Sequence, residues 1–128
     1  MSELPIVLVD GRNVLRSQWP NLPEQELVEH CRVWAERKAV RVVVAFDGRA
    51  PGNLVGELIE GELLTVVGTG PESADDWLTR EATALADAGV EHWLVTSDRE
   101  LRLRAGKRVA RSIGGGAFLR ELLEERAP

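Results

Sequence analysis

Three aspartates end segments whose apolar runs are typical of buried strands. Asp10 ends "PIVLVD", Asp47 ends "VVVAFD" and Asp98 ends "WLVTSD". Because the carboxyl ends of parallel strands meet at one edge of a sheet, we expect the three carboxylates to lie together there. Each one alone has a simpler explanation as a turn residue or a helix cap. Three at equivalent positions favour a shared site, since like charges at close range repel unless a divalent cation neutralises them.

The stretch "ESADDW" offers a fourth carboxylate at the start of a predicted helix. Ser73 and Asp76 match the Ser-x-x-acid pattern of a helix N-terminal capping box. On a helical wheel Asp76 points away from the apolar face, whereas Asp75 lies at the edge of that face and can lean over the sheet. We therefore expect Asp76 to help start the helix and Asp75 to join the carboxylate site.

Four carboxylates without a cysteine or histidine cluster predict a site for a hard divalent cation. The chain has one cysteine and two histidines, and their spacing matches no zinc site. Mg²⁺ and Mn²⁺ prefer oxygen ligands of this kind, and either ion can activate a water and stabilise the leaving oxygen of a phosphodiester. The pattern predicts hydrolysis of a nucleic-acid backbone, with Mg²⁺ or Mn²⁺ as cofactor.

The elements that must position these residues alternate between strands and helices. Strands are predicted within residues 4–11, 40–48, 61–70, 91–98 and 108–113, and helices within 21–38, 73–89, 99–106 and 116–125. The Gly-rich segment 49–61 predicts a loop or a short hairpin. This alternation predicts an α/β fold, a three-layer α/β/α sandwich around a mostly parallel sheet of about five strands.

Length and composition predict one domain over residues 1–128. The chain is 44% hydrophobic and 29% charged, a balance typical of a globular protein. The lone Cys31 excludes an internal disulfide. No apolar run is long enough to span a membrane and no signal-peptide pattern is found, so we expect a cytoplasmic location. The sequence leaves open whether the protein is a monomer or a homodimer.

The net charge of −5 conceals an uneven distribution. Residues 51–97 carry nine acids and one base, a net charge of −8, whereas residues 98–128 carry five acids and eight bases, a net charge of +3. Six of those bases lie between Arg99 and Arg111. A charge run of this kind is either an ordinary solvated surface or a patch for an anionic partner, and the pattern alone does not decide between them.

Four segments together resemble the YacP-like NYN domains of the PIN-like nuclease superfamily: "VLVDGRNVL", "VVVAFDG", "ESADDWL" and "LVTSDREL". The resemblance extends from Leu4 to about Leu123. It implies a metal-dependent ribonuclease, an endoribonuclease acting on RNA, with mRNA on the ribosome as a further implied partner.

The resemblance also implies roles for individual residues. Asp10, Asp47, Asp75 and Asp98 match the acidic positions of the family, and Asn13, Thr96 and Ser97 match its supporting positions. A turn-forming role explains Asn13 equally well. Five arginines near the acids would surround the site and hold RNA phosphates: Arg12, Arg16, Arg49, Arg99 and Arg102.

Two other functions are compatible with the same fold. The first is an RNA- or ribosome-binding module with little or no catalysis. The second is a phosphatase or phosphoacceptor domain, although the Asp-x-Asp of aspartyl phosphatases is replaced here by Asp10 followed by Gly-Arg-Asn. The chain has neither the Gly-x4-Gly-Lys-Ser/Thr loop of an NTPase nor the Gly-x-Gly-x-x-Gly of a dinucleotide enzyme.

Overall fold

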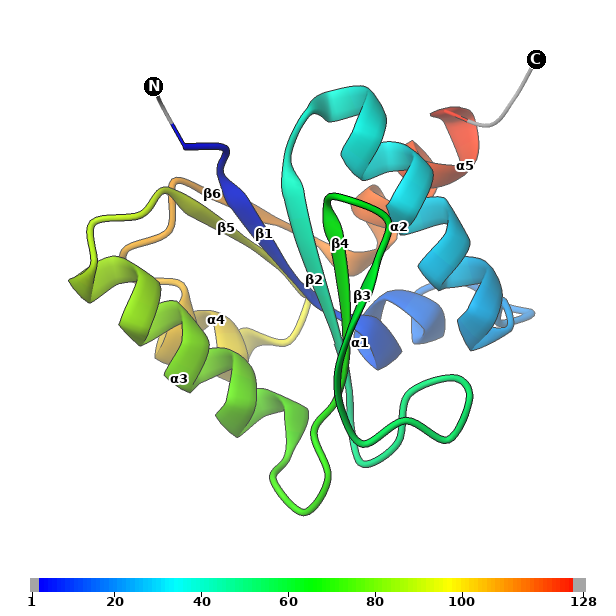
Figure 1. Cartoon of the computed structure of the whole chain (residues 1–128), viewed down its shortest axis with the longest axis horizontal. Helices are drawn as coiled ribbons and strands as arrows, with labels where there is room; N and C mark the ends of the chain where they lie inside the picture. Colours follow the sequence, from blue (N-terminus) through cyan, green and yellow to red (C-terminus); the bar gives the residue numbers. More distant parts are fainter. Residues whose placement is uncertain (1–2, 126–128) are drawn as a thin grey trace.

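The computed structural model describes residues 3–125. Strands and helices alternate along most of this range (Figure 1). In chain order the elements are β1 (Ile6–Asp10), α1 (Gly11–Arg16), α2 (Glu24–Lys38), β2 (Arg41–Phe46), β3 (Gly56–Glu60), β4 (Leu64–Gly68), α3 (Ala74–Asp87), β5 (His92–Val95), α4 (Arg99–Ala105), β6 (Arg111–Ile113) and α5 (Gly115–Glu125).

The strands form one sheet in the order β3-β4-β2-β1-β5-β6. All neighbours are parallel except β3 and β4, which are antiparallel. The order runs outward in both directions from β1 and β2, so the chain reverses direction across the sheet at its centre. In open parallel sheets a ligand site forms at such a reversal, outside the carboxyl ends of the strands.

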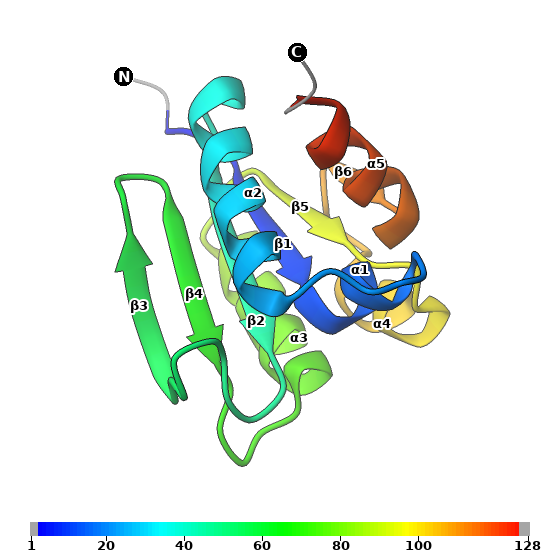
Figure 2. The ribbon, with the colours of Figure 1, turned by 90° about the vertical axis from the view of Figure 1, so that its right-hand side faces the viewer.

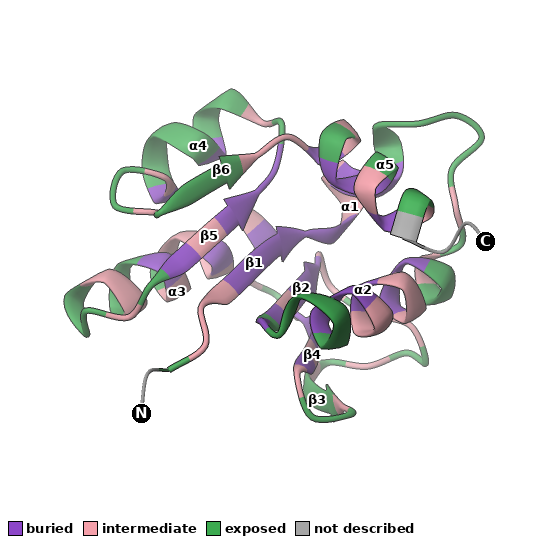
Figure 3. Cartoon of the chain, turned by 90° about the horizontal axis from the view of Figure 1, so that it is seen from above, coloured by how far each residue is buried: buried purple, intermediate pink, exposed green. Residues whose placement is uncertain are grey.

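Helices cover both faces of the sheet, which gives the expected three layers (Figures 1 and 2). On one face α1, α2 and α5 pack against Val7, Val9 and their neighbours, with Trp34 and Phe118 in edge-to-face contact. On the other face α3 and α4 pack against Leu8 and its neighbours. The central strands are buried on both sides, as Figure 3 shows, which explains why they read as continuous apolar runs.

Two elements differ from the expectation. The sheet has six strands instead of about five, because segment 49–61, expected as a loop or a short hairpin, contributes β3, which forms an edge hairpin with β4. Its side chains alternate little in polarity and stay largely exposed, so the hydrophobic pattern was weak there. A short helix, α1, also follows Asp10 where only a turn was expected.

The ends of the long helices follow local chemistry. α2 has acids in its first turn and bases in its last, and it ends at Ala39, whose φ of 53° is left-handed. α3 begins at Ser73, whose side chain accepts a hydrogen bond from the backbone N–H of Asp76. Among residues 3–125, no helix combines the length and apolar character that crossing a membrane requires.

Candidate active site

The carboxyl edge of the sheet gathers the four predicted aspartates. β2, β1 and β5 are adjacent and parallel, so Asp10 at the end of β1, Asp47 just after β2 and Asp98 just beyond β5 belong to the same edge. α3 starts at this edge and carries Asp75 in its first turn. Asp75 and Asp47 both repel the Asp10 carboxylate, and Asp98 and Asp47 both repel that of Asp75. The four side chains therefore share one electrostatic environment.

Asp10 is the most buried of the four, with 6% of its surface exposed. Burial raises the pKa of its carboxyl group to about 6, and repulsion from Asp75 and Asp47 adds to this. The hydroxyl of Thr96 opposes the rise by donating a hydrogen bond to Asp10 Oδ2 at 3.0 Å. A carboxylate with a pKa near neutrality changes its charge within the range in which many enzymes work.

Asp75 and Asp76 have different surroundings, as the helical wheel predicted. Asp75 is half-buried, and burial together with repulsion from Asp98 and Asp47 raises the pKa of its carboxyl group. Within the described residues its carboxylate has no hydrogen bond or ion pair. Asp76 is exposed and pairs with the guanidinium of Arg104 at 2.7 Å, which lowers its pKa. Of the two, Asp75 therefore lies closer to the other acids of the edge, and Asp76 is neutralised by Arg104.

Asp47 and Asp98 also support helices. Asp47 Oδ1 accepts a hydrogen bond from the backbone N–H of Ala74 at 2.7 Å, at the start of α3. Asp98 is the N-cap of α4 and accepts from Leu101 N–H at 3.0 Å. The cap explanation considered for Asp98 is thus correct for one of its oxygens. Among residues 3–125, the other carboxylate oxygen of each residue accepts no hydrogen bond from the protein, so a cap and a ligand role are compatible.

The supporting residues link three elements behind the aspartates. Thr96 donates to Asp10 and accepts from the backbone N–H of Asp98 at 3.1 Å. Asn13 Oδ1 accepts from the backbone N–H of Ser97, and Ser97 Oγ accepts from the backbone N–H of Gly115, both at 2.8 Å. These bonds tie α1, the end of β5 and the start of α5 together.

Two glycines permit this close packing. A Cβ atom on Gly11 would lie 2.8 Å from the ring of Phe46. The backbone after Asp10 can therefore pass this close to β2 only because residue 11 has no side chain. A Cβ atom on Gly115 would lie 2.5 Å from Asn13 Oδ1. Real Cβ contacts are not that short, and both positions therefore favour glycine.

The predicted RNA-binding arginines occupy three places near this edge. Arg12 and Arg16 lie on α1 beside a hollow of about 340 Å³, and Arg12 pairs with Glu24 at 3.6 Å. Arg49 lies in the loop after β2 and donates to the carbonyl of Asn53. On α4, Arg102 Nε donates to the carbonyl of Thr96 at 2.9 Å, and the exposed Arg99 is three residues before it.

The chemistry of the donors fits a hard divalent cation. The four carboxylates supply only oxygen, and Asp75 has both oxygens available. Among residues 3–125, no three histidine, cysteine or acidic side chains lie close enough together to hold an ion as they stand. Burial is the main cause of the raised pKa of Asp10 and Asp75, and repulsion from the neighbouring acids adds to it. A cation bound at this edge would relieve that repulsion.

Comparison with models of known protein families identifies the family of this chain. A family model described as a YacP-like NYN domain matches residues 7–128, which is nearly the whole sequence. The chain belongs to the YacP-like NYN domain family. The resemblance stated from its four sequence segments is therefore confirmed.

Solved structures share the fold of this NYN domain. Rae1 (YacP) from Bacillus subtilis matches with a TM-score of 0.69 and 24% identity over 94% of this chain and 75% of that one. A mutant of the same protein matches with a TM-score of 0.71 and 23% identity over 94% and 76%. The T5 D15 protein, co-crystallised with metal ions, has a TM-score of 0.55 and 13% identity over 84% and 54%.

A mutant of the T5 5′-exonuclease has a TM-score of 0.52 and 14% identity over 86% of this chain and 50% of that one. The chain thus has the mostly parallel α/β fold of PIN-like nucleases. A search of curated proteins found no match.

Sequence reasoning missed two contributors to the edge of this NYN domain. Gly115 lies in the run of three glycines after the last predicted strand, yet it contacts both Asn13 and Ser97. Arg104 was counted within a basic run, yet its charge reaches Asp75 as well as Asp76. Both contacts join residues far apart in the sequence, so no local spacing signalled them.

Proposed function

We propose that the chain is a ribonuclease that uses Mg²⁺ or Mn²⁺ and cuts RNA phosphodiester bonds within the strand. The observation that supports this most is the presence of four aspartates at the carboxyl edge of the sheet, where Asp10 and Asp75 are each repelled by neighbouring acids. Asp10 and Asp75 both have a raised pKa, and neither has an adjacent base to neutralise it fully. Placing several acids together without a cation costs stability, so a cationic ligand is the simplest reason for the arrangement.

Asp10, Asp47, Asp75 and Asp98 would hold the ion. A bound Mg²⁺ or Mn²⁺ supplies Lewis acidity and an activated water. Thr96 fixes the orientation of Asp10 through its hydroxyl, and Asn13 fixes the backbone at Ser97. α1, α3 and α4 all begin at this edge, and their N-termini add positive potential near an incoming phosphate.

Arginines around the edge would bind the RNA backbone away from the acids. Arg12 and Arg16 on one side and Arg99 and Arg102 on the other flank the carboxylates, and Arg49 is in the loop after β2. Lys and Arg contacts of this kind position a strand without reading its bases. mRNA is the substrate class that the family resemblance implies, and a ribosome-bound message is one form of it.

The names of the similar structures support the same proposal. The T5 5′-exonuclease is a nuclease by name, and the T5 D15 protein was crystallised with metal ions. Both are related to this chain by fold alone, at 14% and 13% identity. They therefore make nuclease chemistry a reasonable expectation for the fold, and the acids of this chain supply the specific argument.

The test is cleavage of a labelled RNA with Mg²⁺ or Mn²⁺, with chelator as the blank. Asp10→Asn and Asp98→Asn should each abolish cleavage, while circular dichroism shows an intact fold. Undiminished cleavage by either variant would exclude this site assignment. RNA binding that persists in chelator, without cleavage by any divalent ion, would favour the binding module instead.

A further inference from the structure

The basic run between Arg99 and Arg111 divides into three groups in the structure. Arg99 and Arg102 lie on the side of α4 next to the carboxyl edge, where Arg102 is held by the carbonyl of Thr96. Arg111 stacks over the ring of Trp93, with 4.7 Å between its guanidinium carbon and the ring centre. The remaining three bases, Arg104, Lys107 and Arg108, line a separate cavity that the proposed active site does not use.

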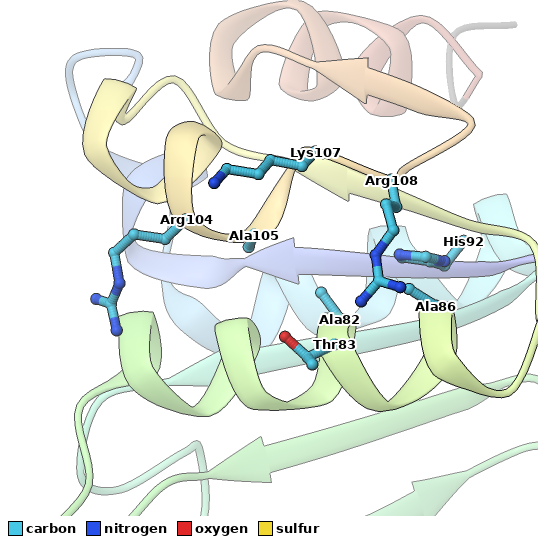
Figure 4. A pocket seen from close by; sticks show the side chains of 8 residues that line it. All are labelled: Ala82, Thr83, Ala86, His92, Arg104, Ala105, Lys107 and Arg108. Carbon is cyan, nitrogen blue, oxygen red and sulfur yellow. The ribbon is translucent and has the colours of Figure 1, made fainter.

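This cavity lies between α3 and α4 and has a volume of about 200 Å³. Figure 4 shows the side chains of Arg104 and Arg108 extending toward α3, whose Ala82 and Ala86 form the opposite wall. Pockets for drug-sized ligands usually have ~300–1,000 Å³. The space is therefore suited to a small group, and its charged lining suits an anion.

The positive charge of the cavity is only partly compensated. Arg104 pairs with Asp76 at one end and Arg108 pairs with Asp87 at the other. All four side chains are more than a third exposed, and ion pairs at such positions contribute little to stability, so they can open for a ligand. Lys107 is exposed and has no ion pair among the described residues. Its charge is available to an anion without breaking any contact.

One end of the cavity lies close enough to the carboxylate edge for their charges to interact. The charge of Arg104 acts on both Asp75 and Asp76, and Asp75 is one of the four acids of the proposed site. From Arg104 the cavity follows α3 toward Asp87, away from that edge. A strand held at the carboxylates therefore meets this cavity if it continues along α3.

We propose that the cavity formed by Arg104, Lys107 and Arg108 binds a backbone phosphate of the RNA strand, one that is not cleaved. The inference rests on the proposed function, because it takes RNA as the ligand of the neighbouring edge. It adds a second contact point on the α3–α4 side, distinct from Arg99 and Arg102. Such a contact would set the direction in which the strand leaves the site.

The experiment measures binding of a labelled single-stranded oligoribonucleotide in chelator, where no cleavage occurs, over a range of KCl concentrations. Each phosphate contact on a single strand contributes ~0.7 to the slope of log K against log salt. Lys107→Gln should lower the magnitude of that slope by ~0.7 and weaken binding several-fold at low salt. Lys107→Arg should restore both values.

Lys38→Gln is the matched control, since Lys38 is the other lysine of the chain and lies at the end of α2 on the opposite face of the sheet. It should leave the slope unchanged. Equal slopes for the wild type and Lys107→Gln, or equal losses in both lysine variants, would overturn the proposal. Circular dichroism of each variant confirms that folded proteins are compared, and Arg108→Gln gives an independent second substitution.

A titration with inorganic phosphate separates the possible sources of the anion. NMR chemical-shift changes at the amides of Thr83 and Ala105 on adding phosphate, together with the smaller salt slope of Lys107→Gln, would support an RNA phosphate in the cavity. Phosphate binding with an unchanged RNA slope would overturn the proposal in favour of a free phosphorylated ligand. If Lys107→Gln lowers the slope and no cleavage is found with any divalent ion, phosphate binding in the cavity is supported and the proposed catalysis is excluded.

Discussion

Asp75 and Asp76 are neighbours in the chain but have opposite surroundings. Asp75 is half-buried among acids, whereas Asp76 is exposed and paired with Arg104. Asp75→Asn should therefore abolish metal-dependent RNA cleavage. Asp76→Asn should retain most activity and shift the unfolding transition little, because the cap of α3 is made by the Ser73 hydroxyl and the backbone of residue 76. Equal loss of activity in both variants would contradict the separate roles.

The raised pKa of Asp10 predicts that the stability of the metal-free protein, measured in chelator, depends on pH in a specific way. Its pKa is raised from 3.8 to about 6 in the folded protein. As pH rises from about 4 to above 6 the unfolded chain loses this proton first, so Asp10 should reduce the free energy of unfolding by ~3 kcal/mol over that window. Asp10→Asn lacks this titration, so its stability relative to the wild type should increase by that amount.

Urea unfolding of both proteins at several pH values between 4 and 8 measures the difference. Parallel curves for the two proteins would show that the pKa of Asp10 is not raised by folding. The cleavage rate offers no substitute for this measurement, because a bound cation would itself lower the pKa of Asp10.

At the scale of elements, the start of α5 must approach α1 closely for the site to form. Gly115→Ala would place a Cβ atom 2.5 Å from Asn13 Oδ1 and displace the link to Ser97. We expect a loss of ~1–3 kcal/mol of stability, as for other overpacked positions, and a reduced cleavage rate.

Gly116→Ala is the control for that substitution. A Cβ atom there would approach no neighbour closer than 3.7 Å, and alanine is the better helix former. Urea unfolding should show equal or higher stability, with cleavage unchanged. If both alanine variants behave alike, the contact with Asn13 is not the constraint on α5.

At the scale of the whole molecule, the carboxylate edge links folding to cation binding. With Mn²⁺ at about 100 times its Kd, the folded state should gain ~2.7 kcal/mol, a rise in Tm on the order of 10 °C. Thermal unfolding of the wild type with and without the ion measures this, with NaCl at equal ionic strength as the blank. The double variant Asp10→Asn/Asp75→Asn should show little of the rise, and an equal rise in both proteins would place the ion elsewhere.

Much of the architecture was predictable because it depends on local chemistry. Continuous apolar runs alternating with amphipathic segments require parallel strands joined by helices, and parallel strands bring their carboxyl ends to one edge. Asp10, Asp47 and Asp98 were therefore expected at one edge, and the structure has them there. The different orientations of Asp75 and Asp76 follow equally from helical periodicity.

The sequence by itself thus determined the α/β order and the edge at which the acids belong, since both depend on the periodicity of neighbouring residues. Only the tertiary structure decided which distant residues meet. The close approach of Gly115 to Asn13, the hydrogen bond between Asn13 and Ser97, and the ion pair between Arg104 and Asp76 all depend on packing between segments remote in the chain. Local spacing carries no record of such contacts, because each is set by how whole elements fill the space around the sheet.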